Sequence, residues 1–388
     1  MSVFDELVGQ DEVVAQLVAA AAAAADGGGA GMTHAWLFTG PPGSGRSNAA
    51  RAFAAALQCP DQGCGHCVTC HQALGGTHPD VAVIVPEGLH LKIDEAREVI
   101  ARSSRAPTRG RWQVTLIEDA DRMEERTSNT LLKAVEEPPP HSVLLLCAPS
   151  AEDLLPTIRS RCRLVPLRTP PSDAVAGVLV DRDGVDPAMA AFAARAAQGH
   201  IGRARRLATD EGARTERSHV LALPRLLGSV GSALVAARDL VDAAKAESDV
   251  LAGSRDAGER EALSTALGGG ATGKGYAGGA PKGGAGALKE LEKRQKSRGT
   301  RTQRDALDRA LVDLAAFYRD VLSLQLGAGA TSVHADLSEQ AATIARGSTA
   351  EQTLRRIDAV LACRVAIDAN VAPLLAVEAM ALALRAGT

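Results

Sequence analysis

Residues 35–59 read AWLFTGPPGSGRSNAARAFAAALQC and combine three patterns in one stretch. The apolar residues 35–39 predict a short buried strand, and the alanine-rich residues after 47 predict a helix. Between them, GPPGSGRS (40–47) follows the phosphate-loop pattern G-x-x-x-x-G-K-[ST] except at the lysine, where Arg46 stands. A strand, a glycine loop and a helix in this order indicate an α/β domain whose loop can hold phosphate.

The alternation of strands and helices continues to residue 168. Three apolar, β-branched runs fit central parallel strands, at residues 80–86, 112–120 and 142–149. IDEAREVIARSS and ERTSNTLLKAVEE predict the helices between them, and an amphipathic helix over residues 11–25 precedes the first strand. We therefore expect a parallel sheet with helices on both faces.

After residue 168 the strand signal ends and helical patterns follow. Residues 169–210 predict a small helical unit, and residues 211–388 predict a larger helical domain. The glycine-rich tract 268–287 predicts a flexible surface loop within that domain, and the alternative is a boundary between two domains. The charged stretch that follows alternates in sign, as a solvated helix does.

The composition and charge of the chain argue against several classes of protein. The 388 residues suggest two or three domains. The formal net charge of −3 provides no global basic field for nucleic acid. The acidic N-terminus lacks the features of a secretion signal, and no apolar run approaches the roughly 20 residues that a bilayer requires. We expect a cytoplasmic protein.

Four of the seven cysteines crowd into twelve positions: Cys59, Cys64, Cys67 and Cys70. In a reducing compartment, thiolates at this spacing predict a structural zinc site with no open coordination position. His66 or His71 could replace one thiolate, and four buried unliganded thiols are the alternative. Residues 59–76 contain no Lys, Arg or aromatic residue, so we do not expect this module to bind nucleic acid.

The phosphate-facing positions depart from a hydrolytic site. The glycines that would let backbone amides surround an anion are present: Gly40, Gly43 and Gly45. Ser47 stands where a hydroxyl would hold magnesium, and Arg46 keeps the charge of lysine but changes its reach. Glu118 and Asp119, after the third strand, reverse the order of a metal-binding Asp and a catalytic Glu. Errors near 1 Å at a reacting centre cost about 100-fold in rate. We expect anion binding to survive better than hydrolysis.

Five stretches together resemble one family: FDELVGQ (4–10), the loop 40–47, the cysteine module, NTLLKAVEEPPPHSVLLL (129–146) and TIRSRCR (157–163). They resemble the bacterial DNA polymerase III clamp-loader subunits, which are members of the AAA+ superfamily. Residues 363–384 are similar to the last collar helices of that family. The resemblance implies an AAA+ domain over residues 1–168 with a zinc module, a helical lid over 169–210 and a helical collar over 211–388.

Two kinds of subunit in that family are candidates: the gamma/tau ATPase and the delta-prime subunit, which supplies an arginine finger. Besides Arg46 and the reversed acid pair, Ala148 and Pro149 stand where a polar sensor is expected, and Gly202 replaces a sensor arginine. The triplet Ser160, Arg161 and Cys162 is intact. This combination fits the delta-prime kind. The resemblance then implies that Arg161 acts on ATP held by an adjacent subunit, and that this chain binds ATP or ADP weakly or not at all.

The implied partners are the gamma/tau and delta subunits, the beta sliding clamp and primed DNA, in a hetero-oligomer without a membrane. The chain would belong to a DNA-directed DNA polymerase holoenzyme without polymerase or significant ATPase activity of its own. Two alternatives remain open. One is an active gamma/tau-type ATPase in which Arg46 replaces lysine, and the other is a DNA-binding module that uses Arg203, Arg205 and Arg206 or residues 293–304.

Overall fold

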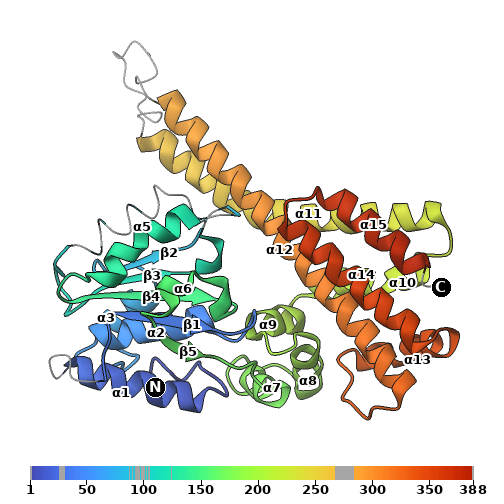
Figure 1. Ribbon diagram of the computed structural model, residues 1–388, viewed down its shortest axis with the longest axis horizontal. Helices are drawn as coiled ribbons and strands as arrows, with labels where there is room; N and C mark the ends of the chain where they lie inside the picture. The colour runs from blue at the N-terminus through green and yellow to red at the C-terminus, as the bar shows by residue number, and fades with distance from the viewer. Residues whose placement is uncertain are drawn as a thin grey trace. The chain divides into compact units, whose positions relative to one another are not determined.

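A computed structural model of the chain describes residues 2–25, 31–86, 88–89, 91, 97, 101, 103, 105–123, 125–266 and 284–386. The chain divides into two compact units, which we call the sheet unit (Met1–Thr209) and the helical unit (Asp210–Thr388). Figure 1 shows the elements of both units with their labels.

The sheet unit is built on five parallel strands in the order β2-β3-β4-β1-β5. The strands are β1 (Ala35–Thr39), β2 (Val81–Ile84), β3 (Gln113–Ile117), β4 (Ser142–Ala148) and β5 (Arg163–Pro166). The first four are the predicted strands, so those predictions are confirmed. Every residue of β1, β3 and β4 is buried, which explains why these strands lack an alternation of apolar and polar residues.

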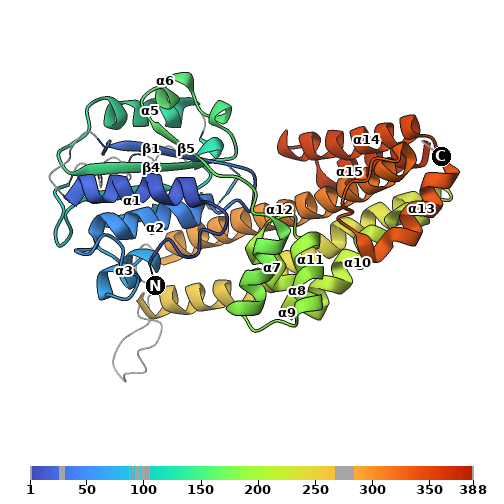
Figure 2. The same ribbon diagram turned by 90° about the horizontal axis from the view of Figure 1, so that it is seen from below.

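Helices cover both faces of this sheet, as expected. Trp36 and Phe38 pack with α1 (Asp11–Ala25), α2 (Arg46–Gln58) and α3 (Val68–Leu74) in one apolar core. Leu37 faces the opposite side, where α5 (Glu125–Glu136) and α6 (Pro156–Arg159) complete a second core. Figures 1 and 2 show these two layers of helices with the sheet between them. The predicted helix over residues 93–104 lies largely outside the described residues.

Three short helices complete the sheet unit: α7 (Ser172–Asp181), α8 (Pro187–Ala196) and α9 (Ile201–Thr209). The turn before α8 is closed by Asp186, whose Oδ1 accepts hydrogen bonds from the amides of Ala188 and Met189 at 2.9 and 3.1 Å. These helices occupy the segment predicted to be helical and belong to the same compact unit as the sheet.

The helical unit surrounds a separate apolar core that includes Leu314, Phe317 and Val377. Its helices are α10 (Glu211–Leu226), α11 (Val230–Ala266), α12 (Gly284–Leu326), α13 (Ser338–Gly347), α14 (Ala350–Asp368) and α15 (Pro373–Ala386). Among the described helices of the chain, none combines the length and the apolar composition needed to cross a membrane.

The charged part of α12 differs from the sequence expectation in two respects. Residues 267–283 of the glycine tract lie outside the described residues, but α12 begins at Gly284, so the predicted loop 268–287 extends too far. The helix is also not solvated all round. Arg298 lies 2.5 Å from Asp256 and 2.6 Å from Glu259 of α11, with 13 % of its side chain exposed. These ion pairs join α12 to α11.

A buried polar network ties α10 to the segment before α13. Nη1 of Arg217 donates to Asp336 at 2.8 Å, and its Nη2 lies 2.7 Å from Nδ1 of His334. Nε2 of His334 lies 3.1 Å from the carbonyl oxygen of Asp313, and Asp320 accepts the amide hydrogen of His334. Because Nδ1 faces a donor and Nε2 an acceptor, the neutral tautomer protonated at Nε2 satisfies both contacts. Burial, and then the charge of Arg217, lower the pKa of His334.

This network predicts a loss of stability at mildly acidic pH. The pKa of His334 is lower in the folded chain than the usual value of about 6.5, so the unfolded state binds more protons between the two values. The contribution of His334 is therefore present above about pH 6.5 and is lost as the pH falls through that window. Denaturant unfolding of the full chain at pH 7.5 and 5.5 should show this loss, and His334→Gln should reduce it. An unchanged pH dependence in the variant would contradict the assignment.

Candidate functional site

The loop between β1 and α2 has a backbone that requires its glycines. Gly40, Gly43 and Gly45 have φ angles of 149°, 87° and 90°, in the region that favours glycine. A Cβ on Gly43 would lie 2.5 Å from Cβ of His200, just before α9, and a Cβ on Gly40 would lie 2.6 Å from the oxygen of Leu167. The helical segment after the sheet therefore packs directly against the loop.

The start of α2 presents polar groups suited to an anion. Arg46 is the first residue of α2, and its buried Nη1 has no hydrogen-bond partner among the described residues. The same holds for the buried Oγ of Ser44. The backbone amides at a helix N-terminus carry partial positive charge, and Arg46 adds a full one. This part of the site fits a phosphate group.

The acid pair after β3 does not fit a magnesium site. Glu118 is ion-paired with Arg51 of α2, whose Nη2 lies 2.8 Å and Nε 3.0 Å from its Oε1. Asp119 adopts a left-handed backbone with φ 50° and ψ 51°, and its carboxylate lies 4.0 Å from Nε of Arg122. A guanidinium thus neutralises the carboxylate that stands at the expected metal-binding position.

The expected loop and acid residues converge at the carboxyl ends of the strands. Burial raises the pKa of Cys147 near the end of β4, where Glu118 raises it further and Arg46 lowers it. Burial, and then the charge of Asp119, also raise the pKa of Asp121. Ser47 is the second residue of α2 and follows Arg46 directly. These charges influence one another because they share one edge of the sheet.

Sequence reasoning missed two residues that support this site. Arg51 stands in the alanine-rich interior of α2, and a charged residue in that setting was the available signal. Gln10, 5 % exposed, donates to the carbonyl oxygen of Arg168 at 2.6 Å and accepts the Arg168 amide at 3.2 Å. Gln10 thereby joins the N-terminal segment to the chain leading into α7, and no local pattern revealed it.

The triplet Ser160, Arg161 and Cys162 follows α6, apart from the phosphate loop. Buried Ile158 anchors α6 in the second core, and the partly buried Cys162 packs against that core. Ser160 and Arg161 are exposed. Nη1 of Arg161 donates to the carbonyl oxygen of Thr157 at 2.8 Å, so this arginine is ordered by its own helix. The structure therefore presents Arg161 at the surface.

The four predicted zinc ligands come together. Their Sγ atoms all lie within 4.8 Å of one another, and the Sγ of Cys59 lies 3.7 Å from that of Cys64 and 3.8 Å from that of Cys67. A tetrahedron with Zn–S bonds of about 2.3 Å has S–S edges of about 3.8 Å. His66 is turned to the carbonyl oxygen of Cys64 at 2.9 Å and is not one of the clustered ligands. The donor set therefore fits a zinc ion.

Helix ends and backbone hydrogen bonds position the four cysteines of the zinc site. Cys59 follows the end of α2, and Cys67 caps α3 by accepting the amide hydrogen of Cys70 at 3.4 Å. Burial raises the pKa of Cys59, but hydrogen bonds from the backbone of Cys64, Gly63 and Asp61 outweigh it and lower the pKa to about 7. Bound zinc would be structural, because four thiolates leave no position for water.

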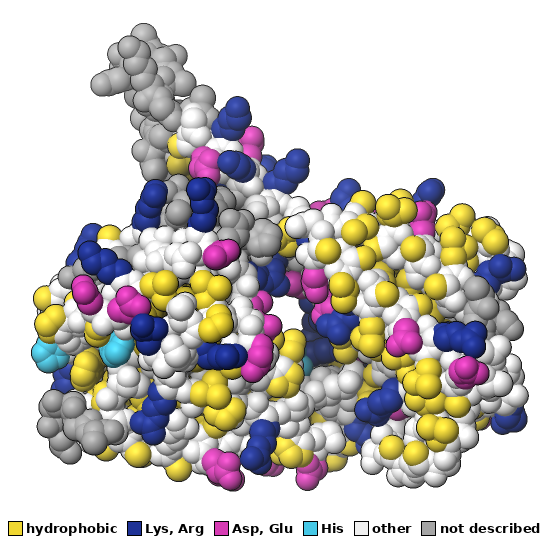
Figure 3. Space-filling model, in the orientation of Figure 1, with side chains coloured by type: hydrophobic (Ala, Val, Ile, Leu, Met, Phe, Trp, Pro, Cys, Tyr) yellow, Lys and Arg dark blue, Asp and Glu magenta, His cyan; other side chains and the backbone are white. Residues whose placement is uncertain are grey.

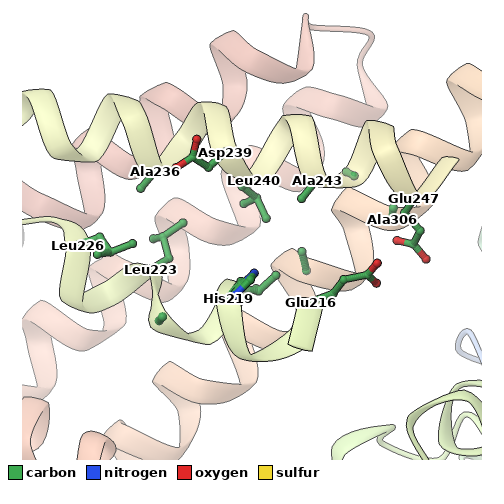
Figure 4. A pocket seen from close by; sticks show the side chains of 14 residues that line it. Glu216, His219, Leu223, Leu226, Ala236, Asp239, Leu240, Ala243, Glu247 and Ala306 are labelled. Carbon is green, nitrogen blue, oxygen red and sulfur yellow. The ribbon is translucent and has the colours of Figure 1, made fainter. Parts of the chain in front are cut away.

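The helical unit contains a pocket that none of the expected site residues lines. It has a volume of about 340 Å³ and lies between α10, α11 and α12. Leu223 and Leu240 are buried in its wall, while the polar side chains at its rim include Glu216, His219 and Asp239 (Figure 4). Its apolar lining distinguishes it from the charged site at the edge of the sheet.

Comparisons with known proteins agree with these motifs. Residues 10–171 match the family model described as DNA polymerase III, delta subunit. The delta' subunit of Pseudomonas aeruginosa is 38% identical over 135 residues, which are 33% of this chain and 41% of that protein. The gamma/tau subunit of Mycobacterium tuberculosis is 32% identical over 191 residues, which are 47% of this chain and 32% of that protein. The chain thus matches less than half the length of these curated relatives.

Two solved structures overlap with the chain. A DNA polymerase III gamma subunit-related protein from Thermotoga maritima is 16% identical, with a TM-score of 0.40 over 91% of this chain and 95% of that one. The RuvB branch migration motor of the same organism is 19% identical, with a TM-score of 0.40 over 56% of this chain and 65% of its own.

The matched residues contain the phosphate loop, the acid pair, the cysteine site and the arginine triplet. The relatives include both delta' and gamma/tau subunits. The five-stranded parallel sheet with its phosphate loop is the fold that the resemblance implied. Over residues 10–171 the sheet unit is thus similar to the DNA polymerase III delta family, and the chain is similar to the delta' and gamma/tau subunits.

Proposed function

We propose that this chain is a delta-prime-type clamp-loader subunit that does not hydrolyse ATP itself. Arg161 acts instead on ATP held by an adjacent gamma/tau subunit. With the delta subunit, the complex opens the beta sliding clamp and places it around primed DNA in the cytoplasm. The observation that carries the proposal is the ion pair between Arg51 and Glu118, which neutralises the acid expected to hold magnesium.

Three features of the site argue against hydrolysis by this chain. Glu118 is held by Arg51, Asp119 is shorter than the glutamate expected to polarise water, and Arg46 replaces the loop lysine. Each feature changes the position or the neutralisation of a charged group near the phosphates. A positional error of about 1 Å at a reacting centre costs about 100-fold in rate. The glycine backbone and the buried Nη1 of Arg46 still favour an anion, so weak binding of ATP or ADP remains compatible with the proposal.

The position of Arg161 supports action on a neighbouring subunit. Its side chain is 40 % exposed and lies after α6, and its described contacts are with α5 and α6. Arginine fingers supplied by a neighbouring subunit stabilise the charge that develops during phosphoryl transfer. An ordered and exposed guanidinium outside its own phosphate loop suits this role.

An exposed apolar face on the helical unit supports assembly with other subunits. Leu354, Leu361 and Val365 lie on one face of α14, and Leu375 and Leu382 are one heptad apart on α15. α14 and α15 pack against each other, and Figure 3 shows hydrophobic side chains over this part of the unit. Contiguous exposed apolar residues mark interaction surfaces. We assign this face to contacts within the hetero-oligomer.

One observation favours a gamma/tau-type ATPase as the alternative function. The glycine loop keeps its backbone, and Arg46 supplies a cation at the start of α2. The stand-alone DNA-binding module has less support, because Arg205 is paired with Asp183 at 2.7 Å and is not available to a phosphate backbone without breaking that pair. ATP turnover by reconstituted complexes that contain either the wild-type chain or Arg161→Ala tests the proposed function.

A further inference from the structure

Glu136 occupies an unfavourable place for an acidic residue. It is the last residue of α5, where the helix dipole disfavours negative charge. Its Oε1 lies 2.9 Å from Nη2 of Arg161, which supplies the compensating cation. We propose that Glu136 is a positioning residue that orients Arg161 toward the nucleotide of the neighbouring subunit. This inference rests on the proposed function.

The contacts of Arg161 hold its guanidinium in place but do not use all of its N–H donors. Nη1 of Arg161 donates to the carbonyl oxygen of Thr157 at 2.8 Å and to Oγ of Ser160 at 3.4 Å. Nη2 forms the ion pair with Glu136. Among the contacts with described residues, none involves Nε–H and only the ion pair involves Nη2, so these groups can bind phosphate oxygens. The guanidinium is therefore held at both terminal nitrogens and can still bind a further acceptor.

The ion pair between Glu136 and Arg161 contributes to the orientation of the Arg161 side chain. Both side chains are partly exposed, 40 % for Arg161 and 46 % for Glu136, and an exposed pair adds little to folding stability. A free arginine side chain has many rotamers and loses that freedom when it binds. A carboxylate that restricts the rotamers beforehand reduces this loss. Removing Glu136 should thus change the rate on the neighbouring subunit more than the fold of this chain.

The test uses the assembled complex with Glu136→Ala in this chain. We expect kcat at the neighbouring ATP site to fall about 10-fold, less than the roughly 100-fold cost of a 1 Å error because Thr157 still holds Nη1. The KM for ATP should not change, since another subunit binds the ATP. Glu136→Gln keeps an acceptor oxygen and should lose less. The matched control is Glu137→Ala, at the adjacent exposed carboxylate outside this set of contacts, and it should have the wild-type rate.

A double variant separates positioning from other roles. In an Arg161→Ala background, Glu136→Ala should cause no further loss, because the group it orients is gone. If Arg161→Ala alone leaves turnover unchanged, the proposed function fails. If Arg161→Ala lowers turnover but Glu136→Ala does not, the positioning role is overturned and the proposed function stands. The positioning role is equally overturned if Glu136→Ala raises turnover or acts as strongly in the Arg161→Ala background.

Discussion

Replacing Arg161 by alanine is expected to reduce ATP turnover at the neighbouring site by about 10³-fold, the lower end of the range for arginine fingers. The side chain is exposed and ordered by Thr157 and Glu136, so its truncation removes a charge without opening the core. Nucleotide affinity of this chain should not change, because Arg161 makes none of its described contacts with the phosphate loop. Turnover is measured in a complex whose other ATP sites are inactivated.

Arg159→Ala is the matched control for this prediction. Arg159 is also exposed; it is the last residue of α6, two positions before Arg161, and lies 3.6 Å from Glu152. It carries the same charge but lies outside the triplet, so the control complex should have wild-type turnover. Equal losses in the two variants would mean that a general charge effect, and not a finger at position 161, explains the result.

Removing zinc is expected to destabilise the sheet unit by several kcal/mol. The four cysteines join the end of α2 to α3, and without a metal ion this link between the two helices is lost. The loss should be smaller than the full binding energy of a zinc finger, because apolar packing around Trp36 and Phe53 also stabilises this unit. Thermal unfolding with and without a chelator measures the difference.

Cys70→Ser should lower both the zinc content and the unfolding temperature. The control is Cys363→Ala, which changes a buried cysteine of the helical unit outside the cluster and should keep one zinc ion per chain. A metal-free wild-type chain, or a Cys70→Ser variant with full zinc content, would contradict the assignment of the cluster.

The sequence predicted those features that depend on local patterns. The buried strands, the glycine loop before α2 and the cysteine spacing each lie within a few turns of chain, where periodicity and residue type suffice. The cysteine geometry could be anticipated because short spacing leaves four thiols few other arrangements. The end of the glycine tract could not be predicted, because α12 begins at Gly284, within glycine-rich sequence that has low helix propensity.

The ion pairs of the candidate site could not be predicted from local sequence patterns. Arg51 and Glu118 are 67 residues apart and meet only because α2 packs beside the end of β3. Glu136 meets Arg161 because α5 and α6 cover the same face of the sheet. The sequence indicated which acids and arginines were unusual, but the fold determines which of them neutralise one another. Those pairings support the proposal that the loop binds an anion but does not hydrolyse ATP.

The most direct measurement is steady-state ATP turnover by the complex when this chain carries Ser47→Ala and every other subunit is wild type. Ser47 lies in the first turn of α2, where a hydroxyl would hold the magnesium ion of a working site. Because ATP is split on the neighbouring subunit in this account, the variant complex should turn over ATP at the wild-type rate. A loss as large as that of Arg161→Ala would show that this chain's own loop hydrolyses ATP, and would contradict the account.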